Sequence, residues 1–270
     1  MRRGWTVDRA SRLVGTAIAF STFGIGAVVI SATLFPAIRL VSWNPETRRS
    51  RIQRAMRRVM QLFVWWMKTL GVLSYEVHGR ERLDPRGQLV IANHPSLIDV
   101  VFLISLIPEV DCIVKRALYR NPFLRWPVRW AQYIPNDGSN ALIAECARAL
   151  RAGRSLVVFP EGTRTVPGRP YALRRGAAQI ALAADCPVRP VRIVCEPSTL
   201  TKAEPWYRIP YRKPHWRIDV GEAYRATDGL AGEEPPIAAR RVTERFRAGF
   251  PPREPDAAHR AQDPSEPQSV

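Results

Sequence analysis

LVIANHPSLIDV, residues 89–100, joins a short apolar run to a segment with helical spacing. The run at 89–92 is long enough for one buried strand, and Pro95 ends that strand because proline has no backbone N–H to donate. Ser96 is expected to cap a helix that carries Asp99 in its first turn. The stretch therefore predicts a strand, a tight turn and a helix in direct succession.

His94 is predicted at the carboxyl end of this strand, with Asp99 about one helical turn later. An imidazole in this place can face an open cleft while the carboxylate accepts its other ring proton. A general base needs this arrangement, because the acid fixes the tautomer and supports the imidazolium as it forms. A histidine five residues before an aspartate also occurs by chance, so the pair alone does not establish a site.

A second motif follows at the end of another predicted strand. Residues 155–159 form a buried-strand run, and residues 159–165 read FPEGTRT. Gly162 permits a tight backbone turn, and nearby amides with Arg164 can form an anion site. Glu161 can accept from an acceptor hydroxyl or hold the arginine. A lone Glu-Gly-Thr-Arg is an ordinary surface turn, but its pairing with the first motif favours a functional site.

The two motifs, NHPSxxD at 93–99 and FPEGTR about 60 residues later, resemble those of the glycerolipid acyltransferase family. The best-known members of this family are the 1-acyl-glycerol-3-phosphate acyltransferases, and the resemblance covers about residues 76–225. The resemblance implies an enzyme of phospholipid synthesis. It implies catalytic roles for His94 and Asp99 and substrate contacts from Glu161, Gly162, Thr163, Arg164 and Lys115.

The reaction implied by the resemblance is direct transfer of a fatty acyl group from a thioester to a hydroxyl. His94 would remove the hydroxyl proton with Asp99 behind it, and no covalent intermediate is implied. Lys115 or an amide near Gly162 are candidate donors to the developing oxyanion. The expected donor is acyl carrier protein or coenzyme A carrying the acyl chain, and the expected acceptor is lysophosphatidic acid. Neither a metal nor a nucleotide cofactor is implied.

Residues 115–138 depart from the pattern of the family's second motif, which begins at a lysine and usually ends in Ile-Asp-Arg. Asn136 stands about where that arginine, associated with the acceptor phosphate, is expected. Asparagine carries no charge and cannot form a bidentate clamp. A lipid acceptor without a phosphomonoester therefore remains an alternative, unless the phosphate is held by Arg125, Arg129 or Arg164.

The chain of 270 residues has a formal net charge of +17, which implies an acidic partner. Anionic lipid and an acidic carrier protein both fit this charge. Nucleic acid is not expected, because the arginines surround an apolar segment and no nucleic-acid module is present. The cysteines form no CxxC pair and are predicted to be reduced packing residues in a domain that faces the cytosol: Cys112, Cys146, Cys186 and Cys195.

Residues 13–38 contain no charged side chain and are long enough to cross a bilayer core. Arginines on both flanks oppose one clean crossing, because short positive flanks prefer the cytoplasmic side. The following stretch, 56–73, is amphipathic and contains Trp65 and Trp66. We expect a helical pair that dips into one leaflet of the inner membrane and returns, with the catalytic domain facing the cytoplasm. A spanning helix and a core-packed hairpin are the alternatives.

The order of these segments predicts an α/β fold with a mixed, largely parallel sheet flanked by helices and an N-terminal membrane-associated helical segment. Strands are expected at 74–78, 89–92, 110–114, 155–159, 187–194 and 216–221. Helices are expected at 96–107, 117–123, 140–151, 176–184 and 237–250.

Four regions follow from this pattern: a membrane-associated helical segment at 1–75, an acyltransferase domain at 76–225, a basic C-terminal helix at 226–250 and a disordered tail at 251–270. The rival function from another class is a non-catalytic, basic, membrane-bound binding protein. That rival predicts that His94→Ala leaves function intact, whereas an acyltransferase loses its activity.

Overall fold

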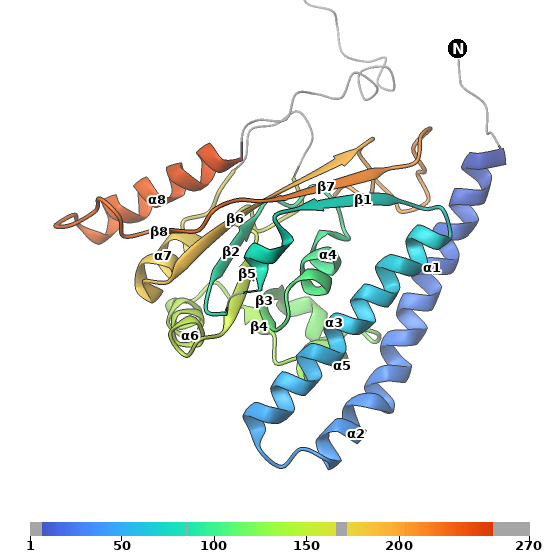
Figure 1. The fold of residues 1–270 in the computed structure, drawn as a ribbon, viewed down its shortest axis with the longest axis horizontal. Helices are drawn as coiled ribbons and strands as arrows, with labels where there is room; N and C mark the ends of the chain where they lie inside the picture. The colour runs from blue at the N-terminus through green and yellow to red at the C-terminus, as the bar shows by residue number, and fades with distance from the viewer. Residues whose placement is uncertain (1–6, 85, 166–171, 203, 251–270) are drawn as a thin grey trace, which may run out of the picture.

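The computed structural model describes residues 7–250, apart from 85, 166–171 and 203. It confirms the predicted fold class, because a mixed, largely parallel sheet of eight strands lies between two layers of helices (Figure 1). The predicted disordered tail at 251–270 lies outside the described residues.

The sheet has the strand order β1-β7-β6-β2-β5-β3-β4, and β8 pairs with β6. The ladders β6–β7 and β6–β8 are antiparallel, and the others are parallel. The carboxyl ends of β6, β2, β5, β3 and β4 therefore meet at one edge. The strands are β1 Ser74–His78, β2 Leu89–Ala92, β3 Val110–Lys115, β4 Ile134–Asn136, β5 Ser155–Val158, β6 Pro187–Glu196, β7 His215–Val220 and β8 Tyr224–Arg225.

Two apolar cores, one on each face of the sheet, hold the helices in place. Helices α1, α3 and α4 contribute to one core, and α6, α7 and α8 contribute to the other. The helices are α1 Val7–Ala32, α2 Leu34–Leu40, α3 Pro45–Thr69, α4 Asp99–Leu106, α5 Arg125–Trp130, α6 Asn140–Arg151, α7 Gly176–Ala184 and α8 Pro235–Gly249, with 3-10 turns η1 Arg80–Leu83 and η2 Arg116–Tyr119.

Several elements differ from the sequence expectation. The helix predicted from residue 96 begins at Asp99, and the helix predicted at 117–123 is the shorter turn η2. The short elements β4, β8 and α5 carry no clear periodicity and were not predicted. Helix α8 packs on α7 and closes the second core, so residues 235–249 form part of the helical layer of the domain.

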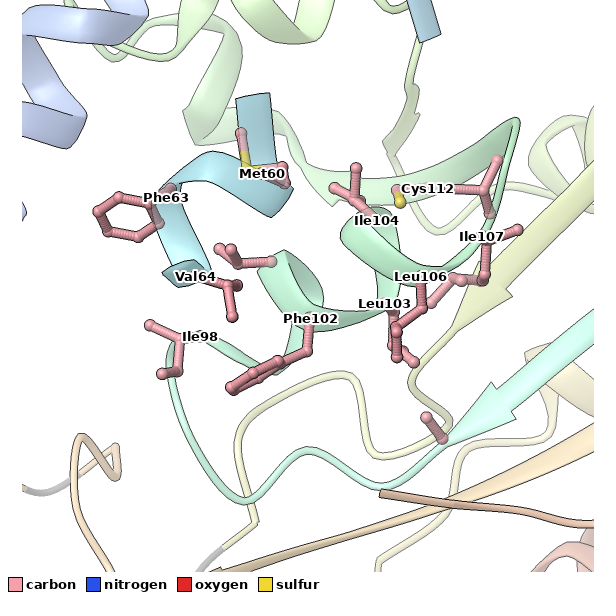
Figure 2. Packing of buried hydrophobic residues seen from close by; sticks show 14 of the residues in the cluster. Met60, Phe63, Val64, Ile98, Phe102, Leu103, Ile104, Leu106, Ile107 and Cys112 are labelled. Carbon is pink, nitrogen blue, oxygen red and sulfur yellow. The ribbon is translucent and has the colours of Figure 1, made fainter. Parts of the chain in front are cut away.

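The apolar stripe of α3 packs on protein, not on lipid. Met60 and Val64 are buried beside the side chains of α4, as Figure 2 shows, and the ring of the buried Phe63 lies 4.8 Å from that of Phe23 on α1. The interpretation of this stripe as part of a membrane-dipping surface is therefore wrong, and the core-packed alternative holds for this face. Its helical spacing is the same for either kind of apolar neighbour, so the sequence alone did not separate them.

Helix α1 keeps much of its apolar surface exposed. The segment Val7–Leu40 is long and apolar enough to cross a membrane, with mean hydropathy 2.1 and only 17% of its most apolar window buried. The chain turns at its end, and α3 returns alongside α1 (Figure 1). Asn44 caps α3 by accepting from the amides of Glu46 and Thr47 at 2.8 and 3.2 Å. The N-terminal region is thus a helical hairpin with one face on the domain.

A buried ion pair attaches this hairpin to the sheet. Asp111 on β3 is fully buried and accepts from the guanidinium of Arg49 on α3. The amide of Gln53 donates to the same oxygen at 2.8 Å, and Arg154 Nε lies 3.1 Å from the other. An unpaired charge in this place would be costly, because little water reaches it. The hairpin is therefore held to the sheet by charge as well as by packing.

Asp111→Ala should destabilise the protein by about 3–5 kcal/mol, because Arg49 is left buried without its partner. The free energy of unfolding in detergent, taken from a urea titration, measures this effect. The matched control is Asp219→Ala, which removes an exposed partner of His78 and should cost about 0–1 kcal/mol. Equal losses for the two variants would contradict the assignment.

Candidate active site

The chain leaves β2 through a side chain that imitates a backbone peptide. Asn93 donates its amide to the carbonyl of Ile193 and accepts from the N–H of the same residue, both at 2.7 Å. This pairing continues the β2–β6 ladder by one position after the main chain has turned away. The turn that follows is thereby anchored at the carboxyl edge of the sheet.

His94 and Asp99 meet in this turn. The imidazole Nδ1 lies 2.9 Å from Asp99 Oδ2, and the histidine side chain is 18% exposed while the carboxylate is fully buried. Nδ1 therefore carries the proton donated to the carboxylate, and Nε2 of the neutral ring has the lone pair. The sequence prediction that these two residues come together agrees with the structure.

The Asp99 carboxylate accepts three further hydrogen bonds. Ser96 donates its backbone N–H at 2.6 Å and its hydroxyl at 2.5 Å. The indole N–H of Trp216 on β7 lies 3.3 Å from Oδ1. Ser96 was expected to cap α4, but it serves the aspartate instead, and Ile98 occupies the N-cap position without a side-chain bond. Each carboxylate oxygen thus has two donors, which holds the acid rigidly behind the imidazole.

The FPEGTR loop holds the backbone of His94 from both sides. Glu161 Oε1 accepts from the His94 N–H at 3.0 Å, and the Thr165 N–H donates to the His94 carbonyl at 2.7 Å. The Thr165 hydroxyl donates to Glu161 Oε1 at 2.7 Å. The prediction that Glu161 holds the arginine is not what the structure shows, because this oxygen serves the histidine and the threonine. The second motif therefore positions the first.

Arg164 braces a neighbouring loop. Its Nη1 donates to the carbonyls of Leu200 and Thr201 at 2.9 and 2.8 Å, and the N–H of Leu97 donates to the Leu200 carbonyl at 3.1 Å. The sequence predicted that Arg164 belongs to an anion site, but its Nη1 donates to carbonyl groups of the protein. The arginine thus joins the turn after β2 to the segment after β6.

Phe159 stacks on the catalytic candidate. Its ring and the imidazole of His94 have centroids 4.2 Å apart and planes inclined by 22°. Gly162 follows with φ +65°, and its N–H donates to the Phe159 carbonyl at 3.0 Å. That amide is therefore already used, so the predicted oxyanion donor near Gly162 would be another amide of the loop. Thr163 is half-buried in the same loop.

Lys115 and Asn136 lie further along the same edge. They end β3 and β4 and are paired in the strand register, and both side chains are exposed. Strand β5 separates β3 from β2, so Lys115 lies about two strand spacings, or roughly 10 Å, from the turn that carries His94. The amide oxygen of Asn136 accepts from the Gly138 N–H at 3.1 Å.

Two functional contacts were missed by sequence reasoning. The sequence predicted Trp216 only as the start of a strand and Phe159 as the end of one. Both lie far along the chain from the residues that they contact, so no local pattern indicates the pairing. In the described residues, no group of three His, Cys, Asp or Glu side chains is placed to hold a metal ion.

Burial also shifts the pKa values of Glu161 in the FPEGTR loop and of Cys146 on α6. It raises the pKa of Glu161, and the hydrogen bonds from Thr165 and His94 partly oppose the change. Burial likewise raises the pKa of Cys146 to about 12, so this thiol stays protonated and is not a nucleophile. The geometry thus places a half-buried imidazole beside a buried carboxylate at the carboxyl edge of the sheet.

Residues 74–194 match the family described as Acyltransferase. A Pseudomonas aeruginosa protein described as a 1-acyl-sn-glycerol-3-phosphate acyltransferase is 26% identical over 152 residues, covering 53% of this chain and 58% of that protein. A Helicobacter pylori protein of the same description is 28% identical over 162 residues, covering 57% and 66%. Over this part of its length, the chain is similar to the glycerolipid acyltransferase family.

A solved structure has the same fold. The crystal structure of the 1-acyl-sn-glycerophosphate (LPA) acyltransferase PlsC from Thermotoga maritima superposes with a TM-score of 0.63 at 21% identity. The superposition covers 88% of this chain and 96% of that one. The sequence matches to the two relatives above span less than two thirds of their lengths.

Glu161→Gln should change how stability depends on pH. Because the pKa of Glu161 is raised in the folded protein, folding takes up a proton between the ordinary carboxyl pKa and the raised one. The contribution of Glu161 to the stability of the wild-type protein is fully present below that pH window, and it is lost as pH rises through the window. The variant lacks this fall, so its stability relative to wild type should increase with pH across the window.

Urea titrations of both proteins in detergent at several pH values measure the difference. A Glu81→Gln variant, altered at an exposed carboxylate of η1, serves as the control and should follow wild type. A stability difference between Glu161→Gln and wild type that stays constant with pH would contradict the prediction.

Proposed function

We propose that this protein is an O-acyltransferase that moves a fatty acyl group from a thioester to the hydroxyl of a lysophospholipid, with lysophosphatidic acid as the acceptor. One observation carries the proposal: the His94 imidazole, backed by the buried Asp99, lies at the carboxyl edge of the sheet with its backbone held on both sides. The names of the Pseudomonas and Helicobacter relatives support the same acceptor.

His94 acts as the general base in this proposal. Nε2 takes the proton of the acceptor hydroxyl as the hydroxyl oxygen attacks the carbonyl carbon of the thioester. When the carbon–sulfur bond breaks, protonated Nε2 returns that proton to the departing thiolate. The products are an ester and a free thiol, and the histidine is regenerated. Asp99 supports the positive charge on the ring between the two transfers.

Lys115 fits the acceptor phosphate better than the oxyanion. An oxyanion donor is held at a fixed place within about 3 Å of the developing charge, whereas the exposed, flexible side chain of Lys115 starts from a main chain about two strand spacings from the His94 turn. A phosphomonoester lies several ångströms from the reacting hydroxyl of the same lipid. Lys115 is paired with Asn136 in the strand register. In this proposal it supplies the positive charge for the acceptor phosphate that an arginine at position 136 would otherwise supply.

The thioester is carried by acyl carrier protein or coenzyme A in this proposal, and the net charge of +17 suits either acidic donor. The exposed apolar surface of α1 supports attachment to a membrane. In this proposal that membrane is the inner membrane, and the catalytic domain lies in the cytoplasm. Asn136, which stands where the family usually has an arginine, favours one alternative acceptor, namely a lipid hydroxyl without a phosphomonoester.

His94→Ala should lower acyl transfer by about 10²–10⁴-fold, because the proton of the attacking hydroxyl loses its acceptor. The measurement is transfer of a labelled acyl chain from acyl carrier protein and from coenzyme A to lysophosphatidic acid in micelles. The matched control is His78→Ala, because His78 also lies 2.8 Å from an aspartate but at a different strand end. Transfer that survives His94→Ala would exclude the proposed base.

Lys115→Gln should raise KM for lysophosphatidic acid about tenfold or more, because a charge-assisted contact to phosphate is lost. The KM for the same lipid without phosphate should not change. Asn136→Arg should lower KM for the phosphorylated acceptor only. Arg148→Gln, an exposed change near the far end of α6, is the charge-matched control. Wild-type transfer to the neutral acceptor alone would establish the alternative instead.

A further inference from the structure

Residues 115–130 follow β3 at the edge of the sheet that holds His94, and they are strongly basic. The segment contains no aspartate or glutamate. It contains five basic residues, and all five side chains are exposed: Lys115, Arg116, Arg120, Arg125 and Arg129. A surface of this kind attracts anions, and its charge is not balanced within the segment itself.

Two large aromatic side chains project from the same segment. Phe123 is 50% exposed and Trp126 is 43% exposed. The guanidinium carbons of Arg125 and Arg129 lie 5.2 and 5.6 Å from the centroid of the Trp126 ring. An exposed indole surrounded by cations is the side-chain combination found at the level of lipid headgroups, where the ring is half in hydrocarbon and the charges meet phosphates.

This surface continues onto α1. The Phe123 ring lies against that helix, because a Cβ added to Gly24 would be 3.7 Å from its Cδ1. A groove of about 400 Å³ runs between the helix and the loop, lined by Phe20, Phe23 and Ile25 on one side and by Phe123 and Leu124 on the other. The loop and the helix thus share one apolar surface.

The exposed apolar residues of α1 border this groove. They fall on a single stripe at helical spacing, and Ile25 belongs both to this stripe and to the lining of the groove: Val7, Val14, Ile18, Ile25, Val28 and Val29. A bilayer that covers the stripe would therefore also reach the groove and the basic segment.

We propose that residues 115–130, together with the groove that they form against α1, are a second lipid-binding surface that adjoins the hairpin and binds the surface of an anionic bilayer. Phe123 and Trp126 insert at the headgroup level, and the five cations contact lipid phosphates. A second copy of the chain is disfavoured as the occupant, because it would bring the same positive charge to the contact.

This proposal deepens the proposed function, because the segment begins at Lys115 beside the catalytic edge. A bilayer bound to this surface brings the lysophospholipid that it contains close to the active site. This acceptor lipid then has a short path from the membrane to His94. The lipid contact and the chemistry can be tested separately.

The first test is an environment-sensitive fluorophore attached to Phe123→Cys in the full-length protein. The four natural cysteines are buried and should not react. Vesicles of phosphatidylcholine with about 30% phosphatidylglycerol should shift the emission to the blue, and phosphatidylcholine alone should shift it much less. The control label at Ile237→Cys, an equally exposed residue on α8, should not shift. No shift at position 123 would overturn the proposal.

The second test removes the charge. Arg125→Gln combined with Arg129→Gln should weaken binding to the anionic vesicles about tenfold or more in flotation assays. The control pair, Arg240→Gln with Arg247→Gln on α8, removes the same charge elsewhere and should have a smaller effect. Equal effects would mean that total charge, not this surface, drives the preference for anionic lipid.

Two further outcomes are distinguishable. A fluorescence shift that depends on protein concentration without lipid would identify the surface as a contact between copies and overturn the proposal. Acyl transfer in micelles by the same proteins reports on the proposed function alone. If wild type transfers nothing, the proposed function fails while the vesicle results still decide the lipid surface.

Discussion

The carboxylate of Asp99 is the group on which the active-site geometry depends. A charged acid with no exposed surface is tolerated only when its oxygens are fully hydrogen-bonded. Four donors meet that need, and they come from the imidazole of His94, from both groups of Ser96 and from the indole of Trp216. The turn after β2, the start of α4 and the position of β7 all follow from satisfying this one charge.

A second buried carboxylate solves a different problem. Asp111 lies on β3 and draws Arg49 and Gln53 of α3 onto the sheet. Helix α3 also packs on α4, which begins at Asp99 (Figure 2). The hairpin and the catalytic turn therefore share one core, and the exposed stripe of α1 has a defined direction relative to the site. The proposed acyl transfer to a lipid needs this relation, because the membrane surface and the reacting hydroxyl must then meet.

Residues of the FPEGTR motif make hydrogen bonds to the protein backbone, although their chemistry suggests an anion site. Glu161 of the motif and Thr165, which directly follows it, hold the backbone of His94, and Arg164 joins two loops through carbonyl groups. Residue types that bind anions in isolation are here used to position a catalytic turn. In the proposed function, the positive charge toward the acceptor phosphate comes from Lys115, which is paired with Asn136 in the strand register.

The sequence by itself determined the order of the main strands and helices, the pairing of His94 with Asp99 and the apolar character of α1. These features depend on neighbours within a few residues, where periodicity and spacing are informative. Only the tertiary structure decided that Trp216 donates a hydrogen bond to Asp99, that Glu161 accepts one from the backbone of His94 and that the apolar stripe of α3 faces protein. Such contacts join residues 67 or 117 positions apart. They arise from the strand order of the sheet, which no local pattern contains.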